Sequence, residues 1–221
     1  MNQAFSFRAF GYPVSVGWGG ILLMAIFGFM EAGRQVNAYG LMVAVLGALV
    51  VGVSVLVHEL GHAVVADRFG MRQPRIRLHG MGGECAYGGY PSARQRLWIA
   101  LSGPAAGLLL GIAALGSAYG VAQAGVSLPP LIGRTLSMLI WVNIVWSILN
   151  LLPMQPLDGS TALLSGMKLK LPARRAMEIG RWVSLVTAGI VGIGSLALGH
   201  NILFLIAALS FYQTWTGSRV I

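Results

Sequence analysis

The sequence predicts an all-α polytopic membrane protein with about six transmembrane helices and a small membrane-associated β-hairpin. Hydrophobic residues make up 56% of the 221 residues and charged residues only 10%, whereas soluble domains average about 45–50% apolar and about 25% charged residues. Long apolar runs also recur along the chain, and a helix needs about 20 such residues to cross about 30 Å of hydrocarbon. Because the polar segments between these runs are short, we expect residues 1–221 to form a single membrane-embedded domain.

Six apolar runs are the predicted spans. The first is preceded by Arg8 and followed by Glu31-Ala32-Gly33, which lacks the small-x-small pattern of a signal-peptidase site, so we expect it to be retained. Only His200 and Asn201 separate the last two. The runs are Val14–Met30, Tyr39–Val65, Leu97–Ala122, Leu131–Leu152, Trp182–Leu198 and Ile202–Trp215.

The basic residues predict the orientation of these spans. Arg34 and Arg134 would lie on one side of the membrane, and the other thirteen of the 15 basic residues on the opposite side. The positive-inside rule makes the richer side cytoplasmic, so both termini of this multi-pass cell-membrane protein should be cytoplasmic. There the net charge of +9 suits anionic lipid headgroups rather than nucleic acid. The thirteen are Arg8, Arg68, Arg72, Arg75, Arg77, Arg94, Arg96, Lys168, Lys170, Arg174, Arg175, Arg181 and Arg219.

The segment after the second span has the pattern of a β-hairpin. Arg75–His79 alternates polar and apolar residues with period two, which indicates a strand. Gly80, Gly82 and Gly83 then offer turn positions before Glu84–Tyr87. We expect a hairpin at the cytoplasmic face of the membrane, and the alternative is an irregular glycine-rich loop.

The third span contains Gly103, Gly107 and Gly111, which recur every four positions. Small residues on one face of a helix let neighbouring backbones approach closely in a membrane. These glycines therefore predict tight packing of this span against another helix.

The second span contains His58-Glu59-Leu60-Gly61-His62, an H-E-x-x-H arrangement. On a helix, residues i and i+4 share a face, so both imidazoles can ligate one zinc ion while Glu59 acts on a water molecule. With four His and four Glu in the chain, shuffling would produce this pattern only about once in a thousand sequences. Ionisable residues inside an apolar helix are expensive and usually mark a functional site.

A catalytic zinc generally has three protein ligands and keeps one position for water. His200 and Glu31 map to the opposite side of the membrane, Asp67 lies near the end of the same helix, and Glu178 lies among basic residues in a loop. Asp158 remains as the third candidate. It follows two prolines in Asn150–Gly159, which interrupt a helix and free backbone groups that only protein or water can satisfy. The alternative for Asp158 is a cap of the next helix.

Three parts of the sequence together resemble the site-2 protease family of intramembrane zinc metalloproteases. The first is the motif from His58 to His62, and the second is Asn150–Gly159, which is similar to that family's N-x-x-P-x-P-L-D-G. The third is Gly103–Gly107, with the sequence Gly-Pro-Ala-Ala-Gly, which is similar to its glycine-proline motif. Many members carry Asn at the position of Gly107. No PDZ or CBS domain is recognisable, so the resemblance implies a minimal catalytic core.

The resemblance implies a role for each site residue. His58, His62 and Asp158 would be the zinc ligands, and Glu59 the general base that deprotonates water. Asn150 would donate a hydrogen bond to the peptide or to the developing oxyanion. The implied activity is hydrolysis of peptide bonds in transmembrane protein substrates near the cytoplasmic leaflet, in regulated intramembrane proteolysis.

Other functions share some of these residues. A protease of the CAAX-processing type also carries H-E-x-x-H, but its third ligand is a downstream glutamate, which here would be Glu178. Rhomboid chemistry lacks a serine–histidine signature in this chain, and presenilin-like chemistry needs a second intramembrane aspartate beside Asp158. A zinc-binding membrane scaffold or transporter without hydrolysis is the alternative from a different class.

Overall fold

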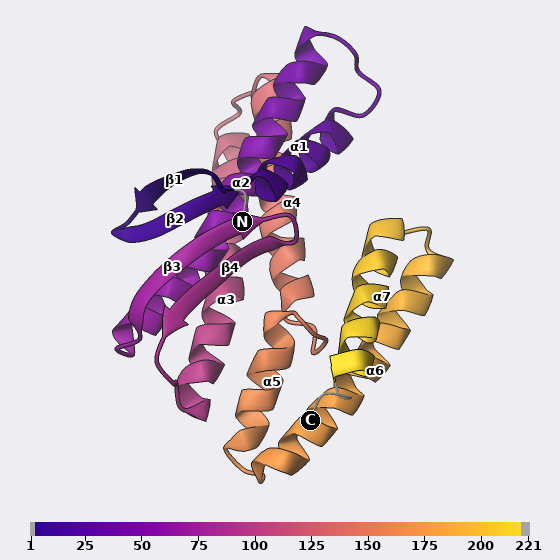
Figure 1. Ribbon diagram of the computed structural model, residues 1–221. Coiled ribbons are helices and arrows are strands. Elements are labelled where there is room, and N and C mark those ends of the chain that lie inside the picture. Colours follow the sequence, from indigo (N-terminus) through magenta and orange to yellow (C-terminus); the bar gives the residue numbers. More distant parts are fainter. Residues whose placement is uncertain (1–2, 218–221) are drawn as a thin grey trace. The chain divides into compact units, whose positions relative to one another are not determined.

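The computed structural model describes residues 3–217. These residues divide into two compact units. The first contains the chain up to Tyr90 together with Ser102–Ser147, and the second contains Pro91–Leu101 together with the chain from Ile148 onward. Figure 1 labels the strands β1 (Gln3–Ala9), β2 (Tyr12–Gly17), β3 (Arg72–His79) and β4 (Gly82–Gly88) and the helices α1 (Trp18–Ala32), α2 (Ala38–Arg68), α3 (Ala93–Gln123), α4 (Pro130–Asn150), α5 (Asp158–Lys168), α6 (Ala173–Ala197) and α7 (Asn201–Thr216).

The first unit contains a four-stranded sheet in the order β1-β2-β3-β4. The predicted hairpin is confirmed as the antiparallel pair β3–β4. It is part of a larger sheet, because β2 pairs with β3 in parallel, with Val14 opposite Ile76. In this order β2 and β3 are central, while β1 and β4 form the two edges of the sheet.

The N-terminal boundary of the first predicted span is wrong. Val14–Gly17 belongs to β2, and α1 begins only at Trp18. Val14 and Val16 are buried in the core with Ile76 and Leu78 of β3, whereas the intervening Ser15 is only half-buried. This period-two burial is that of a strand, and the adjoining apolar residues of α1 made it look like the start of one long apolar run.

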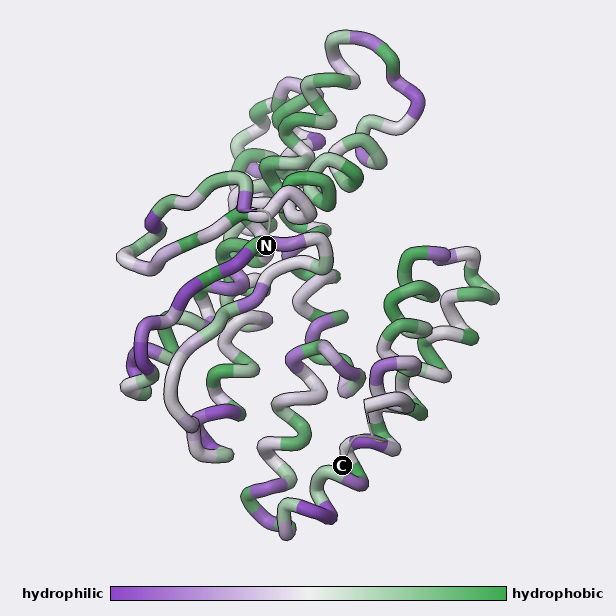
Figure 2. Tube along the Cα trace, viewed as in Figure 1, coloured by the Kyte–Doolittle hydropathy of each residue, from purple (hydrophilic) through white to green (hydrophobic). Residues whose placement is uncertain are grey.

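Four helices are long and apolar enough to cross a membrane by length and composition, namely α2, α3, α4 and α6. The predicted number of about six spans is not confirmed. Helix α1 has 15 residues and α7 has 16, fewer than the roughly 20 that a full span needs. Figure 2 shows hydrophobic residues following one another along α1 and α2, in contrast to the several hydrophilic residues of β3.

Helix α2 has 31 residues and well-defined ends. Its N-cap is Asn37, whose side chain accepts a hydrogen bond from the backbone N–H of Gly40 at 2.8 Å. After Arg68 the chain turns at Gly70, whose φ of +76° favours glycine and ends the helix. Helix α2 contacts α1, β3 and β4 in the same unit, so one long helix joins the apolar part of this unit to the sheet.

Glycines set the packing between α3 and α4, as the sequence predicts. A Cβ at Gly111 would lie 2.7 Å from Cγ1 of Ile144, and one at Gly107 would lie 2.3 Å from Oγ of Ser147. Both distances are shorter than real carbon contacts, so a Cβ at either glycine would force Ile144 or Ser147 to move.

One ion pair relates the ends of α1 and α4. Nε of Arg134, near the start of α4, lies 3.0 Å from Oε1 of Glu31, near the end of α1. A second guanidinium nitrogen of Arg134 donates to the backbone carbonyl of Glu31. Glu31 and Arg134 therefore lie at the same end of the first unit. The sequence analysis places both residues on the same side of the membrane, which agrees with this arrangement. Arg219, which the charge argument also used, lies outside the described residues.

In the second unit, α6 packs against α7 and α5 packs against α6. The sequence analysis did not predict α5, an 11-residue helix that begins at Asp158 and has Lys168 in its last turn. An acidic residue in the first turn and a basic one in the last both stabilise a helix through its dipole. Residues 151–157 form the irregular segment that precedes α5.

Candidate metal centre

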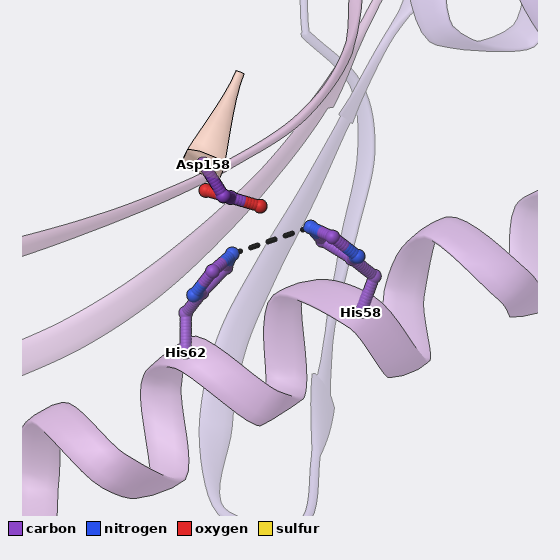
Figure 3. Close-up of side chains that lie close together, drawn as sticks. All are labelled: His58, His62 and Asp158. Atoms are coloured by element: carbon purple, nitrogen blue, oxygen red, sulfur yellow. Dashed lines mark hydrogen bonds between the residues drawn. The ribbon is translucent and has the colours of Figure 1, made fainter. Parts of the chain in front are cut away.

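His58 and His62 lie one turn apart on α2, and both side chains are buried. Their Nε2 atoms are 3.2 Å apart, the dashed line in Figure 3. The ring centroids are 4.9 Å apart and the ring planes are inclined by 80°. Two nitrogens that bind one tetrahedral zinc at about 2.0–2.1 Å must be about 3.3–3.4 Å apart. The pair is therefore already spaced like two ligands of one zinc ion.

Gly103 of α3 keeps the space in front of the two imidazoles open. A Cβ at this position would lie 2.2 Å from Nε2 of His62 and 2.8 Å from Nε2 of His58. The two Nε2 atoms thus face the one position of this helix turn that has no side chain. Helix α3 comes this close because Gly61 of α2 lies against the backbone of Ser102, where a Cβ would be 2.4 Å from the carbonyl oxygen.

His58, His62 and Asp158 are the candidate metal ligands, and Figure 3 draws their side chains. The donors are two imidazole nitrogens and one carboxylate oxygen, a set typical of catalytic zinc. Asp158 is half-buried and is the first residue of α5 in the second unit. Asn150 is the last residue of α4 and is buried, also within the second unit.

Glu59 is 5% exposed and lies beneath the hairpin. A Cβ at Gly83 of β4 would be 2.5 Å from both Cγ and Oε1 of Glu59. The backbone of β4 therefore lies directly against the carboxylate of the H-E-x-x-H motif. The close approach of these two groups requires glycine at position 83.

The other acidic residues that the sequence analysis considered have different surroundings. The carboxylate of Asp67 accepts a hydrogen bond from the hydroxyl of Tyr12 at 3.1 Å, and Glu31 is paired with Arg134. Glu178 is exposed on α6. Burial and the nearby charges of Glu59 and Glu84 raise the pKa of the Cys85 thiol on β4 to about 12, so this thiol is protonated at neutral pH.

A buried serine holds the segment that leads to Asp158. The backbone N–H of Gln155 donates to Oγ of Ser184 on α6 at 2.9 Å. Ser184 is fully buried and lies 3.1 Å from the hydroxyl of Thr214 on α7. The preceding residue of the segment, Met154, is also fully buried. Helices α6 and α7 thus fix the irregular backbone just before Asp158.

Sequence reasoning found the histidines and the carboxylates but missed three residues that shape their surroundings. Gly103 was assigned to helix packing and to the glycine-proline motif, Gly83 to a turn, and Ser184 was not singled out. The spacing of Gly103 does signal close packing, but no pattern in the sequence says which side chains it faces.

Several known proteins are similar to this chain. The model of peptidase family M50 matches residues 46–129. Rip3 of Mycobacterium tuberculosis is 35% identical over 162 residues, which cover 69% of this chain and 40% of Rip3. A zinc metalloprotease of Methanocaldococcus jannaschii is 27% identical over 215 residues, which cover 97% of this chain and 60% of that protein. Stage IV sporulation protein FB of Bacillus subtilis is 27% identical over 168 residues, which cover 73% of this chain and 56% of that protein.

The chain thus spans 40–60% of the length of these curated relatives. Among solved structures, the site-2 protease from Methanocaldococcus jannaschii matches with a TM-score of 0.64 and 24% identity, over 98% of this chain and 97% of that one. This likeness shows a shared fold.

Proposed function

The chain belongs to peptidase family M50, the site-2 protease family, and from that premise we propose that it is an intramembrane zinc metalloprotease. Its substrates would be transmembrane proteins, which it would cut near the cytoplasmic leaflet in regulated intramembrane proteolysis. The observation that carries the proposal is the spacing of His58 and His62, whose Nε2 atoms lie 3.2 Å apart in front of Gly103. That residues 1–221 act as one catalytic domain stays a prediction.

We assign the metal ligands as His58, His62 and Asp158. The donor set fits zinc, and when bound, zinc supplies Lewis-acid polarisation of the scissile carbonyl and makes water more acidic. Asp158 starts α5 without a side-chain cap at the preceding residue, and the bond from Gln155 to Ser184 restrains the backbone ahead of it. The exposed Glu178, which a CAAX-type site would use, has no comparable restraint.

Glu59 is assigned as the general base. Its carboxylate would accept a proton from the attacking water and pass it to the leaving amine, and general acid–base catalysis of this kind contributes about 10²–10⁴ in rate. Burial under Gly83 restricts where the carboxylate can turn. Asn150 would donate to the peptide or to the developing oxyanion, a contribution worth about 3–4 kcal/mol in other hydrolases.

The depth of the site determines how substrate and water reach it. His58 precedes Arg68 by ten residues, or about 15 Å along a helix. If the basic end of α2 is cytoplasmic, as the distribution of charge predicts, the site lies below the cytoplasmic surface and takes its water from that side. A substrate helix must unwind locally, because its own hydrogen bonds shield the carbonyl groups from attack. Both termini are then cytoplasmic, and the basic loops contact anionic lipid.

The edge strand β4 is the proposed binding site for the unwound substrate. Within residues 3–217, β4 pairs with β3 alone, and Gly83 brings this strand against Glu59. An extended peptide that adds to the free edge gains main-chain hydrogen bonds and passes close to the general base. Strand β3 cannot serve in this way, since it lies between β2 and β4.

Single prolines at residues 84–87 test the role of β4. Proline removes one backbone donor, so variants at alternate positions should lose cleavage while they keep their zinc. Prolines in β3 should instead disrupt the sheet, and charge reversal at Arg75 or Arg77 should have little effect on cleavage. If every β4 variant folds, holds zinc and cleaves at the parent rate, substrate is bound elsewhere.

Metal-dependent cleavage tests the proposed function as a whole. Purified protein in lipid nanodiscs should cut a model transmembrane substrate that carries helix-weakening residues near its cytoplasmic end. A chelator should abolish cleavage and added zinc should restore it. Zinc binding without any cleavage of such substrates would favour the scaffold or transporter.

A further inference from the structure

Two polar residues on α4, Asn143 and Ser147, have no part in the proposed mechanism. They lie one helical turn apart, and Asn143 is 2% exposed and Ser147 1% exposed. Helix α4 is otherwise apolar enough to cross a membrane. Polar groups in such a helix are expensive unless they make hydrogen bonds, so their partners indicate what these residues do.

The carboxamide of Asn143 is only partly satisfied by the protein. Its Nδ2 donates to Oγ of Ser54 on α2 and to the carbonyl oxygen of Leu139, both at 2.8 Å. These two bonds use both of its N–H groups. No residue in the described part of the chain donates to its carbonyl oxygen, Oδ1.

The hydroxyl of Ser147 is likewise unpaired within residues 3–217. A hydroxyl on a helix commonly donates to the carbonyl four residues earlier. Thr135 does so on the same helix, to Leu131 at 2.8 Å. Ser147 makes no such bond, so it is free to bind another group.

A small cavity lies beside these two unpaired groups, within the first unit. Its volume is about 10 Å³. This is about the space that a single buried water molecule needs. The cavity exists because residue 107 is glycine, since a Cβ there would lie 2.3 Å from Oγ of Ser147. His58 forms part of the wall. The lining residues are Ser54, His58, Gly107, Val142, Asn143, Trp146 and Ser147.

We propose that this cavity binds one water molecule that bridges Asn143 and Ser147 and contacts the ring of His58. The water would donate to Oδ1 of Asn143 and share a second hydrogen bond with Oγ of Ser147, which gives it the two or more polar partners that a buried water needs. Asn143 and Ser147 are thereby positioning residues, through which α4 restrains a metal ligand on α2. The inference rests on the proposed function for the role of His58.

Binding of Co²⁺ to the purified chain of residues 1–221 tests the site without measuring cleavage. Loss of an outer-sphere partner of a metal ligand typically weakens metal binding 10- to 100-fold. We expect Ser147→Ala to weaken Co²⁺ binding about 10-fold and to shift the visible absorption bands of the bound ion. Gly107→Ala, which fills the cavity, should have the same effect. Thr135→Ala is the matched control, because its hydroxyl bonds only to its own helix, and it should leave affinity and spectrum unchanged.

A double-mutant cycle distinguishes one shared water from two separate effects. If Asn143 and Ser147 act through the same water, the Asn143→Ala/Ser147→Ala protein should bind Co²⁺ no more weakly than the weaker of the two single variants. Fully additive losses would overturn the proposal. So would parent affinity and spectrum in folded Ser147→Ala and Gly107→Ala proteins. Failure of the parent protein itself to bind Co²⁺ would instead overturn the proposed metal centre.

Discussion

Gly103→Ala is a one-methyl change that should remove the metal without unfolding the protein. The new Cβ would lie 2.2 Å from Nε2 of His62, whereas ordinary contacts begin at 3.4 Å. The imidazole must therefore retreat by about 1.2 Å, several times the tolerance of about 0.2 Å that metal-ligand distances allow. Loss of a direct ligand should weaken zinc binding by more than the 10- to 100-fold typical of an outer-sphere partner.

The size of this effect can be read from thermal or chemical unfolding in detergent. At a zinc concentration of 100 times the parent dissociation constant, binding stabilises the parent by about 2.7 kcal/mol. A variant with 100-fold weaker affinity would gain only about 0.4 kcal/mol under the same conditions. Zinc content after dialysis, measured by mass spectrometry, provides an independent reading.

Gly116→Ala is the matched control on the same helix. No atom lies within 4 Å of a Cβ at position 116, so the substitution should stabilise the protein by about 0.4–1 kcal/mol and leave zinc binding unchanged. If the Gly103→Ala protein keeps the parent zinc affinity, the space in front of the histidines is not the metal site and the assignment fails.

Three further outcomes are expected. Asp158→Ala should weaken zinc binding while Glu178→Ala should not. If Asp158 only caps its helix, Asp158→Ala would cost about 0.5–2 kcal/mol of stability without affecting the metal. Unchanged zinc affinity in Asp158→Ala would make Glu178 the next candidate ligand. Ser184→Ala should remove the hydrogen bond from the N–H of Gln155, which is worth about 0.5–1.5 kcal/mol, and weaken zinc binding by loosening the segment before Asp158. Ser195→Ala should leave zinc binding unchanged, since the hydroxyl of Ser195 donates within its own helix. Equal zinc affinities for the two serine variants would refute the role of Ser184 in holding this segment. Alkylation of Cys85 should stay slow at pH 8 and speed up only as the pH approaches about 12, because the raised pKa keeps the thiol protonated; rapid labelling at pH 8 would contradict the burial of this side chain.

The positions of the two histidines were predictable from the sequence because they depend on local spacing. His58 and His62 share a face of α2 through helical periodicity alone, and the period-two pattern of Arg75–His79 correctly indicated a strand. Prolines near Asp158 likewise predicted irregular backbone, which the structure has at residues 151–157.

The features that were missed depend on contacts between distant segments. Strand β2 is recognisable only once β3 pairs with it, because Val14 and Val16 belong to an apolar run that continues into α1. The roles of Gly103 and Ser184 arise from which neighbouring element each one meets. The first span was predicted to start too early because hydropathy does not show that β2 precedes α1 and that Gly33 ends it after 15 residues.

Glu59→Gln tests the central claim most directly. The purified variant and the parent should be compared for zinc content and for cleavage of the same transmembrane substrate. Because the carboxylate acts on water and does not ligate the metal, we predict full zinc occupancy and a rate at least about 10²–10⁴ lower than that of the parent. A folded, zinc-loaded Glu59→Gln protein that cleaves at nearly the parent rate would contradict the account.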